Sequence, residues 1–263
     1  MEQARPTGVV RTADPTLKVI RLLDDRPFDG PANMARDEAL LTRVGAGDSP
    51  PTLRLYQWDP PTISLGYFQR YADFESLPSP AGDLSVVRRM TGGGAILHDI
   101  ELTYSLAVPL DHPLVAPNPI RLYEVAHKAI MSCLHGLGLD AERCGLSDDS
   151  GAAKGPFFCF ARRHRFDVLI GRDKIAGSAQ RRTRRAVLQH GSIILANRCD
   201  QQPTAQAPLP YGEAVSRLRN AMPIKFSEVT GFSIGPGEWS SDERADVESL
   251  IPKYAGDEWT KRT

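Results

Sequence analysis

Cys159 is the residue whose type and neighbours point most directly to chemistry. It lies among Phe157, Phe158 and Phe160, and the basic run 162–165 (Arg-Arg-His-Arg) follows at once. Nearby positive charge favours the thiolate, which is the nucleophilic form of cysteine. A cysteine among aromatic side chains is, however, more often a buried and inert thiol. These residues alone leave both interpretations open.

A second feature is the segment "RRMTGGGAILHD", residues 88–99, in which Gly92, Gly93 and Gly94 are consecutive. Without Cβ atoms, the backbone N–H groups there can approach an anion or a narrow ligand. The segment is neither a P-loop nor a dinucleotide-binding fingerprint, because no Gly-Lys-Ser/Thr follows and the G-x-G-x-x-G spacing is absent. It predicts either a ligand-binding loop or a flexible turn between two strands.

The third feature is "DKIAGSAQRR", in which Lys174 follows a tight turn and Gly177 and Ser178 come shortly after it. Such a lysine can direct a fixed positive charge at a carbonyl or phosphate oxygen, although a lysine in a turn is more often a solvated surface charge. His98 and His190 lie in β-type segments and are either site residues or hydrogen-bonded structural histidines.

The overall charge of the chain excludes few classes of binding partner by itself. Its 263 residues include 32 basic and 32 acidic side chains, so the formal net charge is zero. Basic residues gather between Arg162 and Arg185 without interleaved aromatic residues over 172–185, which favours a solvated face or an acidic protein partner over nucleic acid. No apolar run could span a bilayer and the first residues lack a secretory apolar core, so we expect a cytoplasmic protein with no membrane partner.

The remaining cysteines have weaker claims to chemistry. Cys133 lies on the apolar side of an expected helix, whereas Cys144 and Cys199 lie in loop-like sequence. The four cysteines show no C-x-x-C pairing and no companion histidine spacing. We therefore expect neither a zinc site nor, in a reducing compartment, a disulfide.

Several elements must position these residues. The first expected helix covers residues 31–45, with Asn33 as its candidate cap. Alternation of apolar and polar residues predicts an antiparallel hairpin over 52–58 and 62–68. Strands are expected over 84–90 and 102–109, so that the three glycines connect two strands.

The second half of the chain also contains predicted helices and strands. Helical spacing is most regular over 121–139. Ser240 and Glu243 have the spacing of a capping box before a final amphipathic helix. The other expected elements are a small-residue loop over 145–156, a hairpin over 166–170 and 174–180, and a strand over 186–195.

Together these elements predict an α/β protein of the α+β type, with a mixed, largely antiparallel sheet flanked by helices. Residues 1–16 are polar and contain two prolines, and we expect them to form a flexible amino-terminal segment. Residues 17–263 are expected to form a single domain.

Five separated motifs, in this order, resemble the lipoate-protein ligase and octanoyltransferase family, which is related in fold to biotin protein ligases. They are "GPANMARDEALL", "PTLRLYQWDPPTISLGYFQ", "RRMTGGGAILHD", "KIAGSAQRR" and "LQHGSIIL". The resemblance covers about residues 19–197, with a weaker match through the final helix. It implies the mixed α/β catalytic domain of that family and the attachment of an octanoyl or lipoyl group to a lysine of a lipoyl domain.

The resemblance also implies roles for particular residues. The arginine-glycine loop would line the acyl and nucleotide site, and Lys174 would contact the acyl carbonyl. Cys159 and Lys174 are therefore expected to be catalytic. The expected substrate-binding residues are Arg88, Arg89, Thr91, Gly92, Gly93, Gly94, His98, Gly177, Ser178 and His190.

Two branches of the family remain to be separated. The transferases take octanoate from acyl carrier protein, hold it as an enzyme thioester and require no cofactor, whereas the ligases activate free lipoate with ATP and Mg. The pair Cys159-Phe160 lies fifteen residues before Lys174, which resembles the cysteine-dependent transferases. The expected absence of the extra carboxy-terminal domain of two-domain ligases favours the same branch. Gly94 favours the ligases, since that transferase branch often has arginine there.

The transferase is the favoured interpretation, with the ATP-dependent ligase as its alternative and a non-catalytic binding homologue as the third. The implied partners are octanoyl-acyl carrier protein and lipoyl domains, namely the glycine cleavage H protein and the E2 subunits of 2-oxoacid dehydrogenases.

Overall fold

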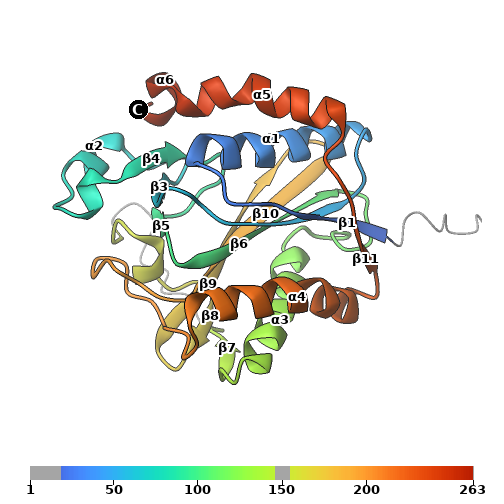
Figure 1. Cartoon of the computed structure of the whole chain (residues 1–263). Helices are drawn as coiled ribbons and strands as arrows, with labels where there is room; N and C mark the ends of the chain where they lie inside the picture. Colours follow the sequence, from blue (N-terminus) through green and yellow to red (C-terminus); the bar gives the residue numbers. More distant parts are fainter. Residues whose placement is uncertain (1–18, 146–154, 263) are drawn as a thin grey trace, which may run out of the picture.

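A mixed sheet of eight strands runs through the centre of the molecule (Figure 1). The computed structural model describes residues 19–145 and 155–262, so the predicted flexible segment 1–16 and most of the predicted loop 145–156 lie outside the described residues. The spatial order of the strands is β11-β1-β2-β6-β10-β9-β8-β7. Their bounds are β1 Val19–Asp24, β2 Thr52–Tyr56, β6 Glu101–Pro109, β7 Ala141–Arg143, β8 Val168–Ile170, β9 Asp173–Arg182, β10 Ala186–Ile194 and β11 Ser233–Pro236.

Helices cover both faces of this sheet (Figure 1). Strand β1 is parallel to its neighbours β2 and β11, and the other pairs of the sheet are antiparallel. This arrangement confirms the predicted fold class. The helices on one face are α1 (Gly30–Ala46), α5 (Ser241–Ala255) and the short α6 (Asp257–Thr260), and those on the other are α3 (Arg121–Gly136) and α4 (Tyr211–Thr230).

A second, three-stranded sheet corrects one prediction. Strand β3 (Thr62–Leu65) pairs with β4 (Ser85–Arg88) and β5 (Ile96–His98), and α2 (Tyr71–Glu75) follows β3. The predicted hairpin of 52–58 with 62–68 is therefore wrong, because β2 lies in the large sheet between β1 and β6. Pro60 and Pro61 separate the two segments, and prolines cannot donate the hydrogen bonds that would continue a ladder. The glycine segment connects β4 to β5, both in the small sheet, and not to the predicted strand 102–109, which is β6 of the large sheet.

The other predicted elements are confirmed with small changes of bounds. Helix α5 begins with the predicted capping box, in which the Ser240 hydroxyl accepts from the Glu243 N–H and the Glu243 carboxylate accepts from the Ser240 N–H. Strands β8, β9 and β10 occupy the predicted segments. Helix α4 was not predicted, and Pro223 lies inside it, where proline normally ends a helix.

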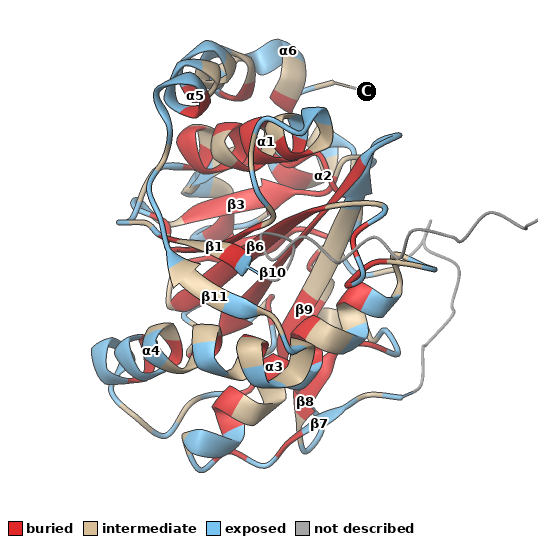
Figure 2. Cartoon of the chain, turned by 90° about the vertical axis from the view of Figure 1, so that its right-hand side faces the viewer, coloured by how far each residue is buried: buried red, intermediate tan, exposed pale blue. Residues whose placement is uncertain are grey.

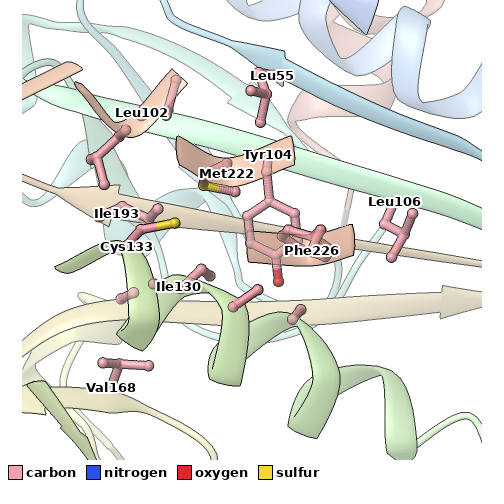
Figure 3. Packing of buried hydrophobic residues seen from close by; sticks show 14 of the residues in the cluster. Leu55, Leu102, Tyr104, Leu106, Ile130, Cys133, Val168, Ile193, Met222 and Phe226 are labelled. Carbon is pink, nitrogen blue, oxygen red and sulfur yellow. The ribbon is translucent and has the colours of Figure 1, made fainter. Parts of the chain in front are cut away.

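The largest apolar core lies between the sheet and the helices α3 and α4 (Figure 3). Burial follows the layers, since the central strands β2, β6 and β10 are buried while the outer faces of α4 and α5 are exposed (Figure 2). Cys133 lies on the apolar face of α3 as predicted, and burial raises the pKa of its thiol to about 12. That thiol is therefore protonated and inert at neutral pH.

Asn33 does not cap α1, contrary to the prediction. The cap is Asp29, whose carboxylate accepts from the N–H of Ala32. Asn33 is buried inside the first turn, and its amide donates to the carbonyl oxygens of Phe28 and Gln57, both at 3.0 Å. A buried amide with these partners connects the start of α1 to the end of β2.

Arg54 on β2 lies at the centre of a buried network of charged and polar side chains beneath α1. Its guanidinium is fully buried and donates to Asp25 at 2.6 Å, to Asp37 at 3.1 Å and to the Asn33 side chain at 2.7 Å. Asp37 also accepts from Tyr56 at 3.1 Å. Burial alone would raise the pKa of Asp37, but His190, Arg54 and Ser105 outweigh it and the pKa lies below its ordinary value.

The variant Arg54→Met should test this network. It leaves the Asp37 carboxylate buried without its cation, so we expect the free energy of unfolding to fall by about 3–5 kcal/mol. Urea denaturation followed by circular dichroism measures the change. Arg43→Met, which removes a surface ion pair with Asp246, is the control and should have a much smaller effect. Equal losses in the two variants would contradict the network.

Candidate active site

Cys159 is held against the glycine segment by backbone hydrogen bonds. It begins a short 3₁₀ turn, Cys159–Ala161. The N–H of Ala95 donates to the carbonyl of Phe157 at 2.9 Å, and the N–H of Cys159 donates to the carbonyl of Ala95 at 2.8 Å. A Cβ added to Gly94 would lie 2.9 Å from the Cys159 nitrogen, so this approach requires glycine at 94.

Lys174 lies beside Cys159, as the spacing of the motif suggested. Its Nζ is 3.7 Å from the Cys159 Sγ and 2.8 Å from a carboxylate oxygen of Asp167. The lysine side chain is almost fully buried and lies over Gly177, where an added Cβ would approach the lysine Cε to 2.5 Å. Gly177 thus makes room for the lysine.

Asp167 is a site residue that sequence reasoning missed. It is buried, and the N–H of His164 donates at 2.8 Å to Oδ2 of Asp167, the oxygen that also contacts Lys174. Burial alone would lower the pKa of Lys174, but the negative charges of Asp167 and of Cys159 as a thiolate outweigh it. The pKa of Lys174 therefore lies above its ordinary value, and its ammonium group stays charged at neutral pH. In the sequence, Asp167 is recognisable only as an acidic residue directly before β8, the strand that precedes Lys174.

Cys159 lies where two pockets meet. The inner pocket runs under the glycine segment towards β2 and β3, and its lining includes Met34, Tyr56, Trp58, Ile96 and His98. The outer pocket opens towards solvent, and its lining includes Lys174, Asp167, Arg162, Arg163 and Gln180. Both are lined by Gly92, Gly93, Cys159, Ser178 and Ala179. An apolar chain can therefore enter the inner pocket while its polar end reaches Cys159.

Arg89 organises the glycine segment from within. It is buried, and one guanidinium nitrogen donates to the carbonyls of Gly92 and Gly94, at 2.8 and 2.7 Å. Because the peptide bond is trans, the N–H of Gly93 points away from Arg89. Burial lowers the pKa of Arg89 to about 10, so it is charged at neutral pH. Gly93 has a φ of 96°, which favours glycine.

Arg88 is not brought to the site. Its guanidinium lies on the other side of the strand and donates to backbone carbonyls, including those of Gln69 at 2.6 Å and Thr260 at 3.0 Å. It lines neither pocket. Thr91 also lines neither, but its hydroxyl is 2.7 Å from Nε2 of His190, which does line the inner pocket.

The two histidines of the site are buried and hydrogen-bonded on both nitrogens. His98 contacts Ser64 and Glu101, each at 2.7 Å, and stacks on Trp58 with ring centroids 3.9 Å apart. Burial lowers its pKa. His190 contacts Asp37 at 2.9 Å through Nδ1. Both predicted residues therefore form the wall of the inner pocket, in fixed orientations.

Ser178 belongs to a directed chain of hydrogen bonds. Burial lowers the pKa of His127 to about 4, and its Nδ1 contacts the carbonyl of Phe166, which can only accept. Nε2 of His127 must then accept from the Ser178 hydroxyl, at 2.6 Å. Tyr104 in turn donates to Ser178 at 2.8 Å. Ser178 can thus offer only a lone pair to the outer pocket.

Two further observations concern ligands and membranes. Within residues 19–145 and 155–262, no three histidine, cysteine, aspartate or glutamate side chains gather closely enough to hold a metal ion. None of the helices in the described part of the chain combines the length and apolar character needed to cross a bilayer.

Comparison with known proteins identifies the family. The model of the lipoyl protein ligase A/B catalytic domain matches residues 29–216, and the chain belongs to this family. It is 37% identical to octanoyltransferase LipM of Kyrpidia tusciae, over 92% of this chain and 98% of that protein. It is 36% identical to octanoyltransferase LipM of Moorella thermoacetica, over 92% and 97%. The resemblance stated from the motifs is confirmed.

Solved structures share the fold. Protein Ta0514 from T. acidophilum superposes with a TM-score of 0.73, at 24% identity over 93% of this chain and 99% of that chain. A lipoate-protein ligase A bound with ATP superposes with a TM-score of 0.72, at 24% identity over 91% and 97%.

The variant Gly94→Ala should test how Cys159 is held. The new methyl group meets Cys159 backbone atoms that have no room to move, so we expect a loss of about 1–3 kcal/mol in the free energy of unfolding. Gly136→Ala is the matched control, because no atom lies within 4 Å of its added Cβ at the end of α3. Urea denaturation compares them. If both unfold at the wild-type urea concentration, the contact between 94 and 159 is not as described.

Proposed function

We propose that this protein is an octanoyl-[acyl carrier protein]:protein N-octanoyltransferase that acts through a thioester on Cys159. The observation that carries the proposal is the Sγ of Cys159, 3.7 Å from the Nζ of Lys174, at the junction of an inner and an outer pocket. The LipM relatives support octanoyl transfer as the activity. Residues 17–263 would act as one catalytic domain.

In the first step the Cys159 thiolate attacks the carbonyl carbon of the octanoyl thioester of the carrier. The new C–S bond forms first and gives a tetrahedral intermediate. The carrier's C–S bond then breaks, and the carrier thiolate leaves and takes a proton from solvent. The intermediate carries a negative oxygen. Lys174 has three N–H donors, and among the described residues Asp167 and Cys159 accept from two of them, so the third could donate to that oxygen. The N–H of Gly93, which points away from Arg89, is a second candidate donor.

In the second step a neutral lysine amine of a lipoyl domain attacks the thioester on Cys159. The amide C–N bond forms, the C–S bond breaks, and Cys159 leaves as a thiolate while the nitrogen releases one proton to solvent. Ser178 can accept a hydrogen bond from a substrate N–H, because its own proton is committed to His127. The first step conserves the thioester and the second converts it to a more stable amide, so the reaction requires no cofactor.

The predicted substrate-binding residues take different roles in this scheme. The inner pocket would hold the octanoyl chain between the glycine segment, Trp58 and His98. Arg89 would act as a positioning residue through the carbonyls of Gly92 and Gly94. Thr91 would act through His190, whereas Arg88 would stabilise the structure far from substrate.

The proposed partners are octanoyl-acyl carrier protein as donor and lipoyl domains as acceptors, including the glycine cleavage H protein and E2 subunits. The alternative, a ligase that uses ATP and Mg, shares the fold of the ATP-bound neighbour. It predicts that Cys159 is dispensable, and one experiment can therefore decide between them.

Intact mass spectrometry tests the thioester. After incubation with octanoyl carrier protein, we expect wild-type enzyme to gain one octanoyl group that hydroxylamine removes, and Cys159→Ala to gain none. Cys133→Ala, which removes another thiol, is the control and should be acylated normally. If Cys159→Ala lipoylates a lipoyl domain from free lipoate and ATP at the wild-type rate, the enzyme is a ligase and the transferase proposal is wrong.

The pH dependence of acylation tests Lys174. Because the pKa of Lys174 is raised, its ammonium persists as the pH increases, and the single-turnover rate should not decline up to about pH 10. Lys174→Met removes one oxyanion donor and should slow acylation on the order of 10²–10³-fold. A wild-type rate that falls between about pH 8 and 9, or an active Lys174→Met, would contradict this role.

A further inference from the structure

The arginines around the outer pocket form an unusual surface. We define the mouth surface by six residues that lie in or next to the pocket rim: Phe68, Arg162, Arg163, Arg181, Arg182 and Arg262. Arg162 and Arg163 line the outer pocket. Arg182 donates to Gln180 of the same lining at 3.0 Å. Arg181 and Arg182 are successive residues of β9 and project to opposite sides of it, Arg182 towards Gln180 and Arg181 towards Tyr67. The mouth surface thus wraps around the end of β9 and joins segments that are far apart in the sequence.

None of these five arginines has an acidic partner within 4 Å among residues 19–145 and 155–262. They contact neutral groups instead, such as the carbonyl of Pro156 at 2.8 Å from Arg162. Elsewhere many arginines of this neutral protein are paired, for example Arg43 with Asp246 and Arg219 with Asp24. Within the described part of the chain, positive charge at the mouth is therefore not neutralised by acidic side chains, and such charge attracts an anionic partner.

An exposed aromatic side chain lies beside these charges. Phe68 is 84% exposed, far more than any other large apolar residue of the described chain. Its ring is 4.0 Å from the position of a Cβ on Gly92 and packs edge-on against Tyr67. The guanidinium groups of Arg262 and Arg181 lie 4.0 and 5.4 Å from the Tyr67 ring centre. Aromatic and arginine side chains together are typical of the energetic centre of protein interfaces.

We propose that the mouth surface is the docking site for the acidic carrier domain that delivers the acyl group. The inference rests on the proposed function and adds a location and a mode of recognition to it. Phe68 provides the apolar anchor, and the arginines provide charge complementarity and contacts to the phosphodiester of the arm that carries the thioester.

The chemistry favours the donor over the acceptor as the occupant. The donor arm carries a negative phosphodiester group and must thread the outer pocket, past Arg162 and Arg163, to bring its thioester to Cys159. The acceptor offers a lysine, whose ammonium form the same arginines repel. The mouth surface should therefore govern the acylation of Cys159 and leave its deacylation largely unchanged.

The two half-reactions can be measured separately. The test variant is Arg181→Glu with Arg182→Glu, and Phe68→Ala is a second, uncharged variant. The matched control is Arg217→Glu with Arg244→Glu, which reverses two exposed charges on α4 and α5. Each enzyme is acylated either by octanoyl carrier protein or by octanoyl-pantetheine, a small donor without phosphate, and the acylated enzyme is then mixed with a lipoyl domain.

With the carrier as donor, we expect the test variant to lose at least tenfold in kcat/KM for acylation, and Phe68→Ala to lose severalfold. With octanoyl-pantetheine all variants should react within twofold of wild type, whatever the salt concentration. With the carrier, added salt should slow wild type, Phe68→Ala and the control variant, all of which keep the arginines of the mouth surface, more than it slows the test variant.

Three outcomes would overturn the proposal: equal loss with both donors, no loss with either, or a loss confined to transfer onto the lipoyl domain. Failure of wild-type enzyme to acylate Cys159 even from octanoyl-pantetheine would instead reject the proposed function.

Discussion

The backbone pairing of Ala95 with the segment 157–159 is the constraint on which the site depends. Two hydrogen bonds, at 2.9 and 2.8 Å, attach the cysteine segment to the end of the glycine loop. Lys174 lies on β9, in the large sheet, whereas the glycine loop joins two strands of the small sheet. The distance between the Cys159 sulfur and the Lys174 ammonium is therefore set by how the two sheets pack. The glycine loop contributes to it because its end holds the cysteine segment.

Charge balance explains why such a site can be buried. Lys174 is almost inaccessible to solvent, and the carboxylate of Asp167 compensates its charge. The buried guanidinium of Arg89 instead donates hydrogen bonds to the backbone carbonyls of Gly92 and Gly94. The site therefore has its donors oriented before substrate arrives. Preorganised donors of this kind contribute most to stabilising a developing negative charge, because they need no rearrangement during the reaction.

The resemblance to the family, and not the residues alone, predicted that Cys159 and Lys174 belong to one site, and the structure places their side chains 3.7 Å apart. The contacts that support them were not predictable from the sequence. Asp167 was missed because its role arises from a tertiary ion pair with no periodic signal. Arg88 was predicted beside Arg89, but successive residues of a strand point to opposite faces, so only one of the two could reach the loop. The false hairpin had a similar origin, since alternation identifies strands and not their partners.

The extent of β8 has a consequence for solubility. Strand β8 pairs with β9 only as far as Ala176, while β10 follows β9 to Arg182 on its other side. From Gly177 onwards β9 therefore presents an outer edge that no strand of the described chain covers. Unpaired edges of this kind can join with other chains, and charged side chains are a common defence. Arg181 and Arg182 lie on that edge, so replacing them with neutral residues would also remove charges that disfavour pairing with another chain.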